Sequence, residues 1–410
     1  MNLGITSFIQ RTYIDAFRGI QREVWYIALI QLINRSGMMV VPFMTLYLTQ
    51  DLSWTKTQAG IATACFGFGN LVGSFLGGWL ANKIPPLRIM FFSLFAGGLC
   101  FVAMAWVQNF YLLCLWILVT ISVADLMRPA SMVAISEYST KTTFTRGISL
   151  LRLAINLGIA VGPAVGGILI AKIGYNTIFI VDGITCILAS FFLYSIFNFD
   201  LGSITIKPNE KEVVKGDGSP YKDYPFLFFL LFNLIMLIMF FQILYSVPVF
   251  FREVFALTED KIGRFFMMNG LLIFALEMPI IYALEKRNLI YRPLVWGIIL
   301  IGLSFLFFLF PFSNVWITII LFNAVISIGE IINFPYISTV AVHRGEGKNK
   351  GSYMGAVSAS FSISFIFAPI AFLPFVDELG YDFMWVICAL SCLLMAFGLK
   401  ILRPHFKDSF

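Results

Sequence analysis

The sequence predicts an all-α integral membrane protein whose twelve transmembrane helices form two pseudo-symmetric six-helix bundles. Of the 410 residues, 59% are hydrophobic and only 12% are charged, whereas soluble domains have about 25% charged residues. Apolar runs of about 20 residues recur along the chain, a length that crosses ~30 Å of hydrocarbon. An internal repeat relates the two halves. No strand-length alternating pattern recurs, as a membrane β-barrel would require.

Twelve apolar runs mark the predicted helices in chain order. The first six form a predicted N-terminal bundle over residues 24–197, and the last six form a C-terminal bundle over 224–402. Residues 198–223, with several Lys, Gly and Pro, read as a cytoplasmic linker, and 403–410 as a cytoplasmic tail. The runs are 24–49, 57–81, 88–107, 111–135, 147–171, 175–197, 224–250, 261–284, 293–310, 315–338, 352–374 and 381–402.

The distribution of basic residues predicts that both termini are cytoplasmic, because loops on that side of a membrane are enriched in Lys and Arg. Residues 1–23 are an amphipathic cytoplasmic segment without the apolar core of a secretory signal, so we expect it to lie on the membrane surface. Of 28 basic residues, 20 then fall inside the cell and three lie within helices. The other five lie at the outer side: Lys56, Lys172, Arg252, Lys261 and Arg264.

Two passages 205 residues apart carry polar groups at the same positions. ISVADLMRPA begins at Ile121 and ISIGEIINFP begins at Ile326. Each places a carboxylate, Asp125 or Glu330, deep in an apolar segment, followed three residues later by Arg128 or Asn333. Charges at such depth are unfavourable by at least ~2.5–3.5 kcal/mol and usually mark a substrate or proton pathway. The repeat therefore predicts a transporter whose working site lies between its halves.

Asp125 and Arg128 share one helix face, because residues three apart are neighbours on a helix. Arg35 lies at a similar depth in the first helix, so two arginines can compete for Asp125, and Asn34 beside it is a candidate substrate ligand. A carboxylate whose ionisation depends on its neighbours can couple a proton to a conformational change. Alternatively, Asp125 and Arg128 form a fixed salt bridge that only neutralises two charges.

Glu277 and Glu330 are the candidate proton carriers of the second half, and Asn333 is a candidate substrate ligand. Alternatively, Glu277 packs against the fifth helix or binds Lys286. Arg152 and Asn156 share a face of the fifth helix. We expect Asn156 to bind substrate and Arg152 to act in gating or structure, with the headgroup region or Glu137 as its partner.

The fifth helix carries closely spaced small residues that permit tight helix packing, with a proline that removes one helical hydrogen bond. This series resembles the GxxxGPxxGG signature of proton-coupled exporters of the major facilitator superfamily, the drug:proton antiporter group. The loop after the second helix resembles the superfamily's GGxLaDRxGRR loop, but Asn82 replaces its acid. The resemblance implies gating or packing roles for Gly158, Gly162, Pro163, Gly166 and Gly167, and for Gly78, Lys83 and Arg88.

The resemblance implies proton-coupled export of small amphipathic molecules by alternating access, in a bacterial cytoplasmic (inner) membrane. We expect no enzyme activity, no metal, no cofactor beyond the proton gradient and no nucleic-acid partner; the expected partners are a small-molecule substrate and the lipid bilayer, and a monomer is expected. One alternative is a proton-coupled importer, because Gln31–Arg35 and Ile155–Gly158 resemble motifs of peptide symporters. Another is a sensor or accessory membrane protein that has lost transport.

Overall fold

The computed structural model describes residues 19–81, 83–139, 144–199, 219–285, 291–345 and 350–406. The predicted amphipathic segment, most of the linker and the last residues of the tail lie outside these ranges. The described residues contain helices and no strand. Eleven stretches are long and apolar enough to span a membrane, and the last of them, Ser352–Leu402, contains two crossings. The predicted all-α, twelve-helix membrane fold is confirmed.

The N-terminal half contains six crossings, of which the first and the fourth are interrupted. The first crossing consists of α2, α3 and the π-helical turn η1, and the fourth consists of α6 and α7. The elements are α2 (Arg22–Ser36), α3 (Val40–Leu46), η1 (Tyr47–Asp51), α4 (Lys56–Ala81), α5 (Pro86–Met104), α6 (Phe110–Asp125), α7 (Met127–Tyr138), α8 (Phe144–Lys172) and α9 (Asn176–Phe197).

The C-terminal half repeats this plan, with α10 and α11 forming one interrupted crossing. Its elements are η2 (Pro220–Lys222), α10 (Tyr224–Phe240), α11 (Gln242–Glu253), α12 (Glu259–Glu285), α13 (Tyr291–Phe305), η3 (Leu306–Phe308), α14 (Val315–Arg344), α15 (Lys350–Phe372), η4 (Leu373–Phe375), α16 (Val376–Leu402) and η5 (Arg403–Phe406). No loop separates α15 from α16: the short η4 and the non-helical Gly380 turn the chain back.

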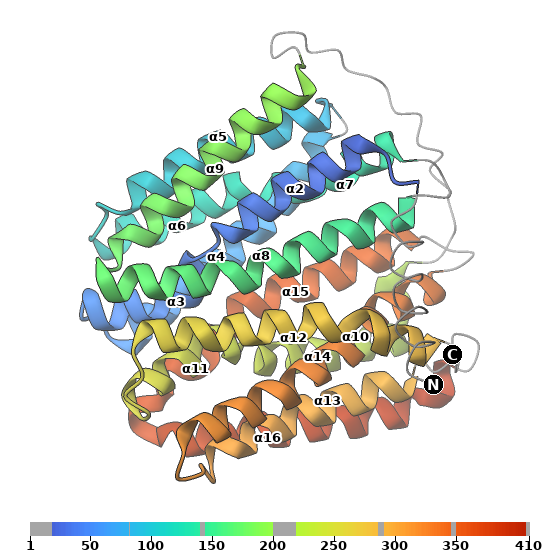
Figure 1. Cartoon of the computed structure of the whole chain (residues 1–410). Coiled ribbons are helices and arrows are strands. Elements are labelled where there is room, and N and C mark those ends of the chain that lie inside the picture. Colours follow the sequence, from blue (N-terminus) through green and yellow to red (C-terminus); the bar gives the residue numbers. More distant parts are fainter. Residues whose placement is uncertain are drawn as a thin grey trace, which may run out of the picture.

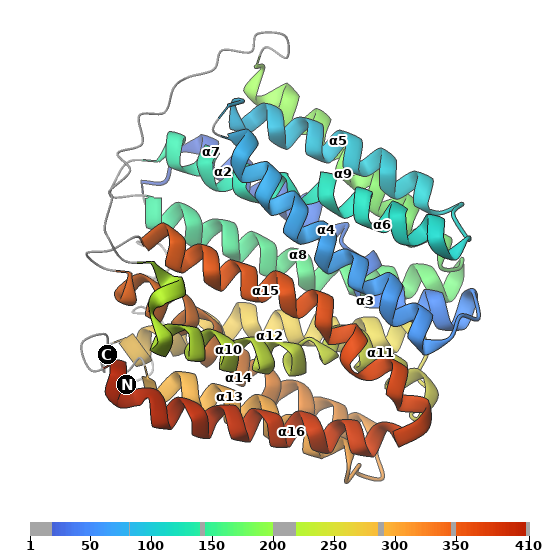
Figure 2. The same cartoon turned by 180° about the vertical axis from the view of Figure 1, so that it is seen from behind.

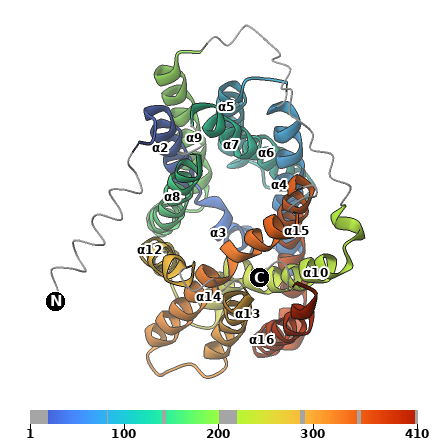
Figure 3. The same cartoon turned by 90° about the vertical axis from the view of Figure 1, so that its right-hand side faces the viewer.

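The two halves lie side by side, with their helices running in roughly the same direction (Figure 1). Seen from behind, α4 and α15 are neighbours across the boundary (Figure 2), whereas α8 and α12 face each other in the first view. Figure 3 looks along the helices and separates the two groups. We call the end that carries the start of α2 and the end of α16 the termini end, and the other the far end.

A polar cluster fixes three helices of the C-terminal half at the termini end. Asp223 precedes α10 and accepts a hydrogen bond from the backbone N–H of Phe226. Arg344, at the end of α14, donates to both carboxylate oxygens at 2.8 and 3.0 Å, and the hydroxyl of Tyr353 on α15 donates at 3.0 Å. Asp223 therefore joins α10, α14 and α15.

Asp223→Asn is expected to lower the stability of the protein by about 1.5–3 kcal/mol, the range for losing a hydrogen bond to a charged group. Burial of the carboxyl would raise its pKa, but the hydrogen bonds from Arg344 and Tyr353 outweigh it and hold the pKa of Asp223 below its usual value. Folding therefore favours the charged carboxylate. Its contribution to the stability of the protein is present at pH values above the ordinary carboxylate pKa and is lost as the pH falls.

Thermal melting in detergent should thus separate wild type from Asp223→Asn at pH 7, and the difference should shrink below about pH 4, near the ordinary Asp pKa. Asp51→Asn is the control, because Asp51 is exposed and its side chain has no hydrogen bond among the described residues. A melting difference that is independent of pH would contradict the assigned role of the Asp223 carboxylate.

Candidate functional site

The first crossing of each half is interrupted at corresponding positions. Between α2 and α3, the chain leaves the helix at Gly37–Met39, and between α10 and α11 it does so at Phe241. Gly37 and Phe241 are separated by 204 residues, close to the period of the internal repeat. Paired discontinuities of this kind point to the binding site in transporters built from repeats. We therefore place the candidate site between these two interruptions.

Polar side chains surround the interruption in the N-terminal half. Arg35 donates from Nη1 to the sulfur of Met38 at 3.0 Å, whereas its Nε is buried without a hydrogen-bond partner. The amide of Asn34 donates to Cys186 Sγ at 3.3 Å. The carboxylate of Asp182 on α9 lies beside the backbone N–H groups at the start of α3, where a helix N-terminus favours negative charge.

Asp125 ends α6 and is nearly fully buried at 9% exposure. The hydroxyl of Ser74 on α4 donates to its Oδ2 at 2.6 Å. The charges of Arg128 and Arg35 both act on Asp125, but neither arginine lies within 4.0 Å of it in the part of the chain that the structure describes. The fixed Asp125–Arg128 salt bridge, which the sequence left open, is thus not formed here.

Aromatic rings surround the interruption in the C-terminal half. The Phe241 and Phe365 rings have centroids only 4.1 Å apart. The backbone of Phe365 and Ile366 lies against Gly67 of α4, where an added Cβ would be 2.5 Å from the nitrogen of Ile366. This cluster therefore reaches the boundary between the halves. Its members are Phe240, Phe241, Phe334, Phe361 and Phe365.

The glycines of α8 hold this helix against both halves. An added Cβ on Gly158 would lie 2.5 Å from the Cβ of Arg35, and one on Gly162 would lie 3.1 Å from the carbonyl oxygen of Ser36. Gly166 packs on Met39. The interruption between α2 and α3 thus rests on the glycine face of α8.

The opposite side of α8 packs on α12. The backbone at Gly167 meets Glu259, and the Pro163 carbonyl meets Gly263. The signature residues therefore lie where α8 is held between its own half and the other half.

Glu277 of α12 bridges the two halves toward the termini end. It forms an ion pair with Arg152 of α8, and its Oε2 accepts a hydrogen bond from Asn156 at 3.0 Å. The expected Arg152 partners, Glu137 and the headgroup region, are replaced by Glu277, because α8 faces α12 rather than α7 at this depth. Of the alternatives for Glu277, contact with the fifth helix is observed, whereas Lys286 lies outside the described residues.

The internal repeat relates the Glu277 site to the Asp125 site. Ser74 and Glu277 are 203 residues apart, and Asp125 and Glu330 are 205 apart. At these two positions the N-terminal half therefore has a hydroxyl and a carboxylate, whereas the C-terminal half has two carboxylates. Glu277 and Arg152 both act electrostatically on Glu330, and the Oε2 of Glu330 is buried without a hydrogen-bond partner.

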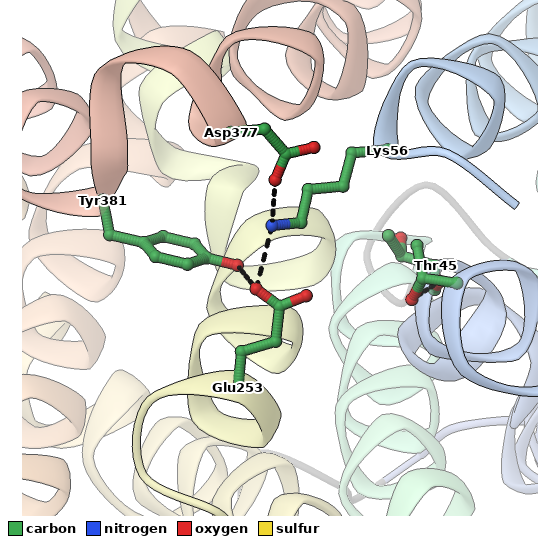
Figure 4. A network of polar contacts seen from close by, with 6 residues as sticks. Thr45, Lys56, Glu253, Asp377 and Tyr381 are labelled. Carbon is green, nitrogen blue, oxygen red and sulfur yellow. Dashed lines mark hydrogen bonds and ion pairs between the residues drawn. The ribbon is translucent and has the colours of Figure 1, made fainter. Parts of the chain in front are cut away.

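Lys56 binds two acids of the other half at the far end. Its Nζ lies 2.9 Å from Glu253 Oε2 and 2.7 Å from Asp377 Oδ1 (Figure 4). The hydroxyl of Tyr381 donates to the same oxygen of Glu253 at 2.8 Å. These four residues, the Lys56 cluster, connect α4 with α11 and α16.

Tyr175 makes a second contact between the halves at the far end. Its hydroxyl donates to Glu259 Oε1 at 2.9 Å, and Arg252 Nε lies 3.7 Å from the same oxygen. The far end is thus closed by polar contacts on two sides.

The helices α4 and α15 diverge from the far end toward the termini end. Gly60, Gly67 and Gly78 lie on one face of α4, since 7 or 11 residues complete nearly whole turns. An added Cβ on Gly60 would lie 3.0 Å from the carbonyl oxygen of Pro369, but one on Gly78 would meet nothing within 4 Å. Gly355 near the start of α15 also meets nothing. Figure 2 shows this divergence of the two helices, whose boundary we call the α4–α15 seam, toward the termini end.

The remaining predicted residues lie outside this arrangement. Asn333 is fully buried and donates to the carbonyl oxygen of Leu294 at 2.9 Å, so it joins α14 to α13 within one half. Lys83 stacks on the Trp79 ring of its own half at 3.7 Å. Arg88 is buried in α5, and Arg128 is exposed on α7. We do not retain Asn333 among the substrate residues.

Some residues that contact the buried acids or bridge the halves were missed from the sequence. Ser74 had a usable signal, because it is the repeat equivalent of Glu277. Lys56 begins an apolar run, and Glu253 and Asp377 lie at the same predicted side of the membrane. The sequence therefore indicated that these three residues lie at a similar depth in the membrane. It did not indicate that their helices are neighbours.

The family model described as Major Facilitator Superfamily matches residues 27–294 and 290–409. The chain belongs to this superfamily, whose members are carriers rather than enzymes, and it is a multi-pass integral membrane transporter. Solved structures with a similar fold include a POT family transporter in complex with 5-aminolevulinic acid, with a TM-score of 0.79 and 15% identity, covering 95% of this chain and 98% of that chain.

Curated relatives are similar at low identity. The uncharacterized MFS-type transporter YqjV of Bacillus subtilis is 23% identical over 338 residues, 78% of either chain. A Na(+), Li(+), K(+)/H(+) antiporter of Planococcus maritimus is 21% identical over 399 residues, covering 89% of this chain and 91% of that one. The quinolone resistance protein NorA of Staphylococcus aureus is 27% identical over 151 residues, 37% of this chain and 38% of NorA.

Proposed function

We propose that this protein exports small amphipathic molecules in exchange for protons by alternating access. The observation that carries the proposal is the bridge of Glu277 to Arg152 and Asn156, a titratable contact inside the membrane between the two halves. A proton on Glu277 removes its charge and weakens its attraction to Arg152. Proton binding is thereby linked to separation of α8 and α12 at the termini end.

The cycle follows from the closures at the two ends. With the predicted cytoplasmic termini, the Lys56 cluster joins the halves at the outer end, and we assign the inner opening to the α4–α15 seam, where the two helices diverge. Opening outside requires Lys56 to leave Glu253 and Asp377. Protons that then arrive from outside neutralise Glu277, Glu330 and Asp125 and favour release of the cargo. Return to the inward-open state delivers these protons to the cytoplasm.

The two interrupted crossings suit an amphipathic cargo. The N-terminal half offers the buried guanidinium of Arg35 and the amide of Asn34, whereas the C-terminal half offers the aromatic cluster around Phe241. A molecule with one polar end and one apolar body can therefore contact both halves at once. Asn156 is held by Glu277 in this structure and becomes available to substrate when that bridge opens.

Export rather than import is supported by the glycine signature of α8 and by the similarity to NorA and the cation/proton antiporter. Alkali cations are a competing cargo, because the Planococcus maritimus relative matches most of the chain. A peptide importer is the second candidate, since Ile155–Gly158 resembles a symporter motif and Asn156 lies on the bridge between the halves.

The test measures proton flux in proteoliposomes that hold a pH-sensitive dye and carry an imposed pH gradient. Lipophilic cations, then zwitterionic amphipaths, Na⁺ or K⁺, and peptides are added in turn. Proton flux opposite to the flux of an amphipath supports the proposal. Proton flux opposite only to Na⁺ or K⁺ flux would show that the cargo is an alkali cation rather than an amphipath. Proton flux in the same direction as peptide flux would show symport rather than export.

In the same assay, Asp125→Asn is expected to lose proton-driven transport by about tenfold or more, because asparagine cannot exchange a proton and about 1.4 kcal/mol already corresponds to tenfold. The hydrogen bond from Ser74 can be kept by the amide oxygen, so the protein should remain folded in the membrane. Asp51→Asn is the control. Normal pH-dependent transport by Asp125→Asn would remove Asp125 from the coupling mechanism.

A further inference from the structure

The helices α4 and α6 pack closely along one face and lie side by side in Figure 2. An added Cβ on each of three successive glycines of α4 would lie 3.0, 2.5 and 2.8 Å from a backbone carbonyl oxygen of the other segment. These contacts join Gly69 to Leu118, Gly73 to Ser122 and Gly77 to Leu126, the residue that follows α6. The partners are 49 residues apart in every contact, so the two helices run in the same direction and stay in register.

Two cysteines continue this register. Cys65 of α4 and Cys114 of α6 lie one turn before the first glycine contact and are also 49 residues apart. The Cys114 thiol donates a hydrogen bond to Cys65 Sγ, and the Cys65 thiol donates to the carbonyl oxygen of Ile61 at 3.5 Å. The proton of Cys65 therefore points away from Cys114, and the two sulfur atoms face each other. A disulfide joins Cα atoms ~4.4–6.8 Å apart, which requires helix backbones that approach as closely as these glycines allow.

The cysteine pair lies beside lipid, on the side of the membrane nearer the far end. Both cysteines are half-buried, and their neighbours Ile61, Phe68 and Leu115 are 45%, 47% and 57% exposed. Cys65 follows Lys56 by nine residues, which is about 13 Å along α4. Water-soluble reductants such as glutathione keep cytosolic thiols reduced, but they do not enter hydrocarbon. An oxidant that dissolves in lipid can reach this pair.

We propose that Cys65 and Cys114 are a redox-active pair, which a lipid-soluble quinone converts to a disulfide between α4 and α6. In this step the two S–H bonds break and one S–S bond forms. The quinone takes up the two electrons and the two protons and leaves as the hydroquinone. A buried cysteine without a partner behaves as a small apolar side chain, whereas the second thiol here supplies the partner that a disulfide requires.

The disulfide would fix the far-end part of α4 to its own half of the protein. Lys56 lies at the start of this part, so α4 could then leave the acids of the Lys56 cluster only together with α6. This consequence rests on the proposed gating role of the cluster, whereas formation of the disulfide does not.

Thiol counting in liposomes tests the pair. The reduced full-length protein is treated with the short-chain quinone decylubiquinone, denatured and labelled with a polyethylene glycol maleimide, which shifts the protein on a gel once for each free thiol. Wild type should lose two of its six free thiols, and mass spectrometry of the digest should find the peptides of Cys65 and Cys114 joined. Treatment with dithiothreitol should restore all six. Cys65→Ser should lose no thiol to the quinone, because Cys114 then has no partner.

Cys388→Ser is the matched control, because it removes one member of a buried pair, Cys388 and Cys392, that lies one turn apart on α16. This variant should still lose two thiols. Six free thiols in quinone-treated wild type, or an equal loss in Cys65→Ser, would overturn the pair. A disulfide-linked dimer in place of the joined peptides would show that cysteines of two copies react instead. A bridge formed with copper phenanthroline but not with the quinone would overturn the quinone as oxidant. None of these readouts depends on transport.

Discussion

Transport by Glu277→Gln should no longer respond to a pH gradient, whereas exchange of cargo across the membrane without a gradient should continue. Glutamine keeps the shape of the side chain and can still accept a hydrogen bond from Asn156, but it carries no charge for Arg152 and releases no proton. Because the Arg152 side chain is 50% exposed, we expect the lost ion pair to be worth only about 1–2 kcal/mol. That change shifts the opening of the termini end roughly tenfold.

Proton flux and cargo counterflow in proteoliposomes separate the two effects of this substitution. Glu23→Gln is the matched control, since Glu23 lies at the start of α2 and away from the boundary between the halves. Arg152→Gln alone should loosen the termini end without removing the titratable carboxylate, so its transport should remain dependent on pH. If Glu277→Gln keeps a normal pH response, Glu330 or Asp125 carries the proton and the bridge is only structural.

Gly67→Val is expected to lower transport about tenfold or more by preventing closure of the far end. An added Cβ at this position would lie 2.5 Å from the backbone nitrogen of Ile366, and backbone atoms cannot move aside as a flexible side chain can. The helices α4 and α15 must therefore separate where they now touch. Overpacking of this kind typically destabilises a contact by ~1–3 kcal/mol, enough to change the preferred state.

Spin labels at Ser53→Cys and Glu378→Cys, in a background without the natural cysteines, report the distance across the far end. Gly67→Val should increase and broaden this distance. Gly78→Val is the control, because Gly78 lies on the same face of α4 but an added Cβ there meets nothing within 4 Å. Equal effects of the two variants would show that this face of α4 does not close against α15.

The crossings could be predicted from the sequence because hydrocarbon requires long apolar helices, whatever their neighbours. The interruptions could not, since Gly37–Met39 and Phe241–Gln242 share no residue type at equivalent positions. The first has a local cause, because Pro42 has no N–H to donate to the carbonyl of Met38, whereas the equivalent residue of the second is Ser246. The helix α14 also extends to Arg344, beyond the predicted end at residue 338, and its last residue bonds to Asp223.

The residues of the candidate site could be predicted from the sequence, but the partners that they contact could not. Asp125, Glu277 and Glu330 stand out in any apolar segment, because a membrane makes their charge unfavourable. Which groups they face depends on helix neighbours, and Arg152 illustrates this: a partner on its own half was expected, whereas the fold presents α12. The same lack of neighbour information hid the Lys56 cluster and placed Asn333 in the cavity rather than in a helix contact.

The unequal state of the two seams has a consequence for how cargo reaches this transporter. At the termini end, α8 and α12 remain joined through Glu277, while α4 and α15 stand apart. With the cytoplasmic termini that we propose, an entrance between α4 and α15 would be one-sided and border the inner leaflet, so we expect molecules dissolved in the bilayer to enter laterally. Their supply is then set by partitioning into lipid. An apparent KM expressed as the total concentration of added substrate should rise as the amount of lipid per protein is increased, while the same KM expressed as a mole fraction in the lipid stays constant.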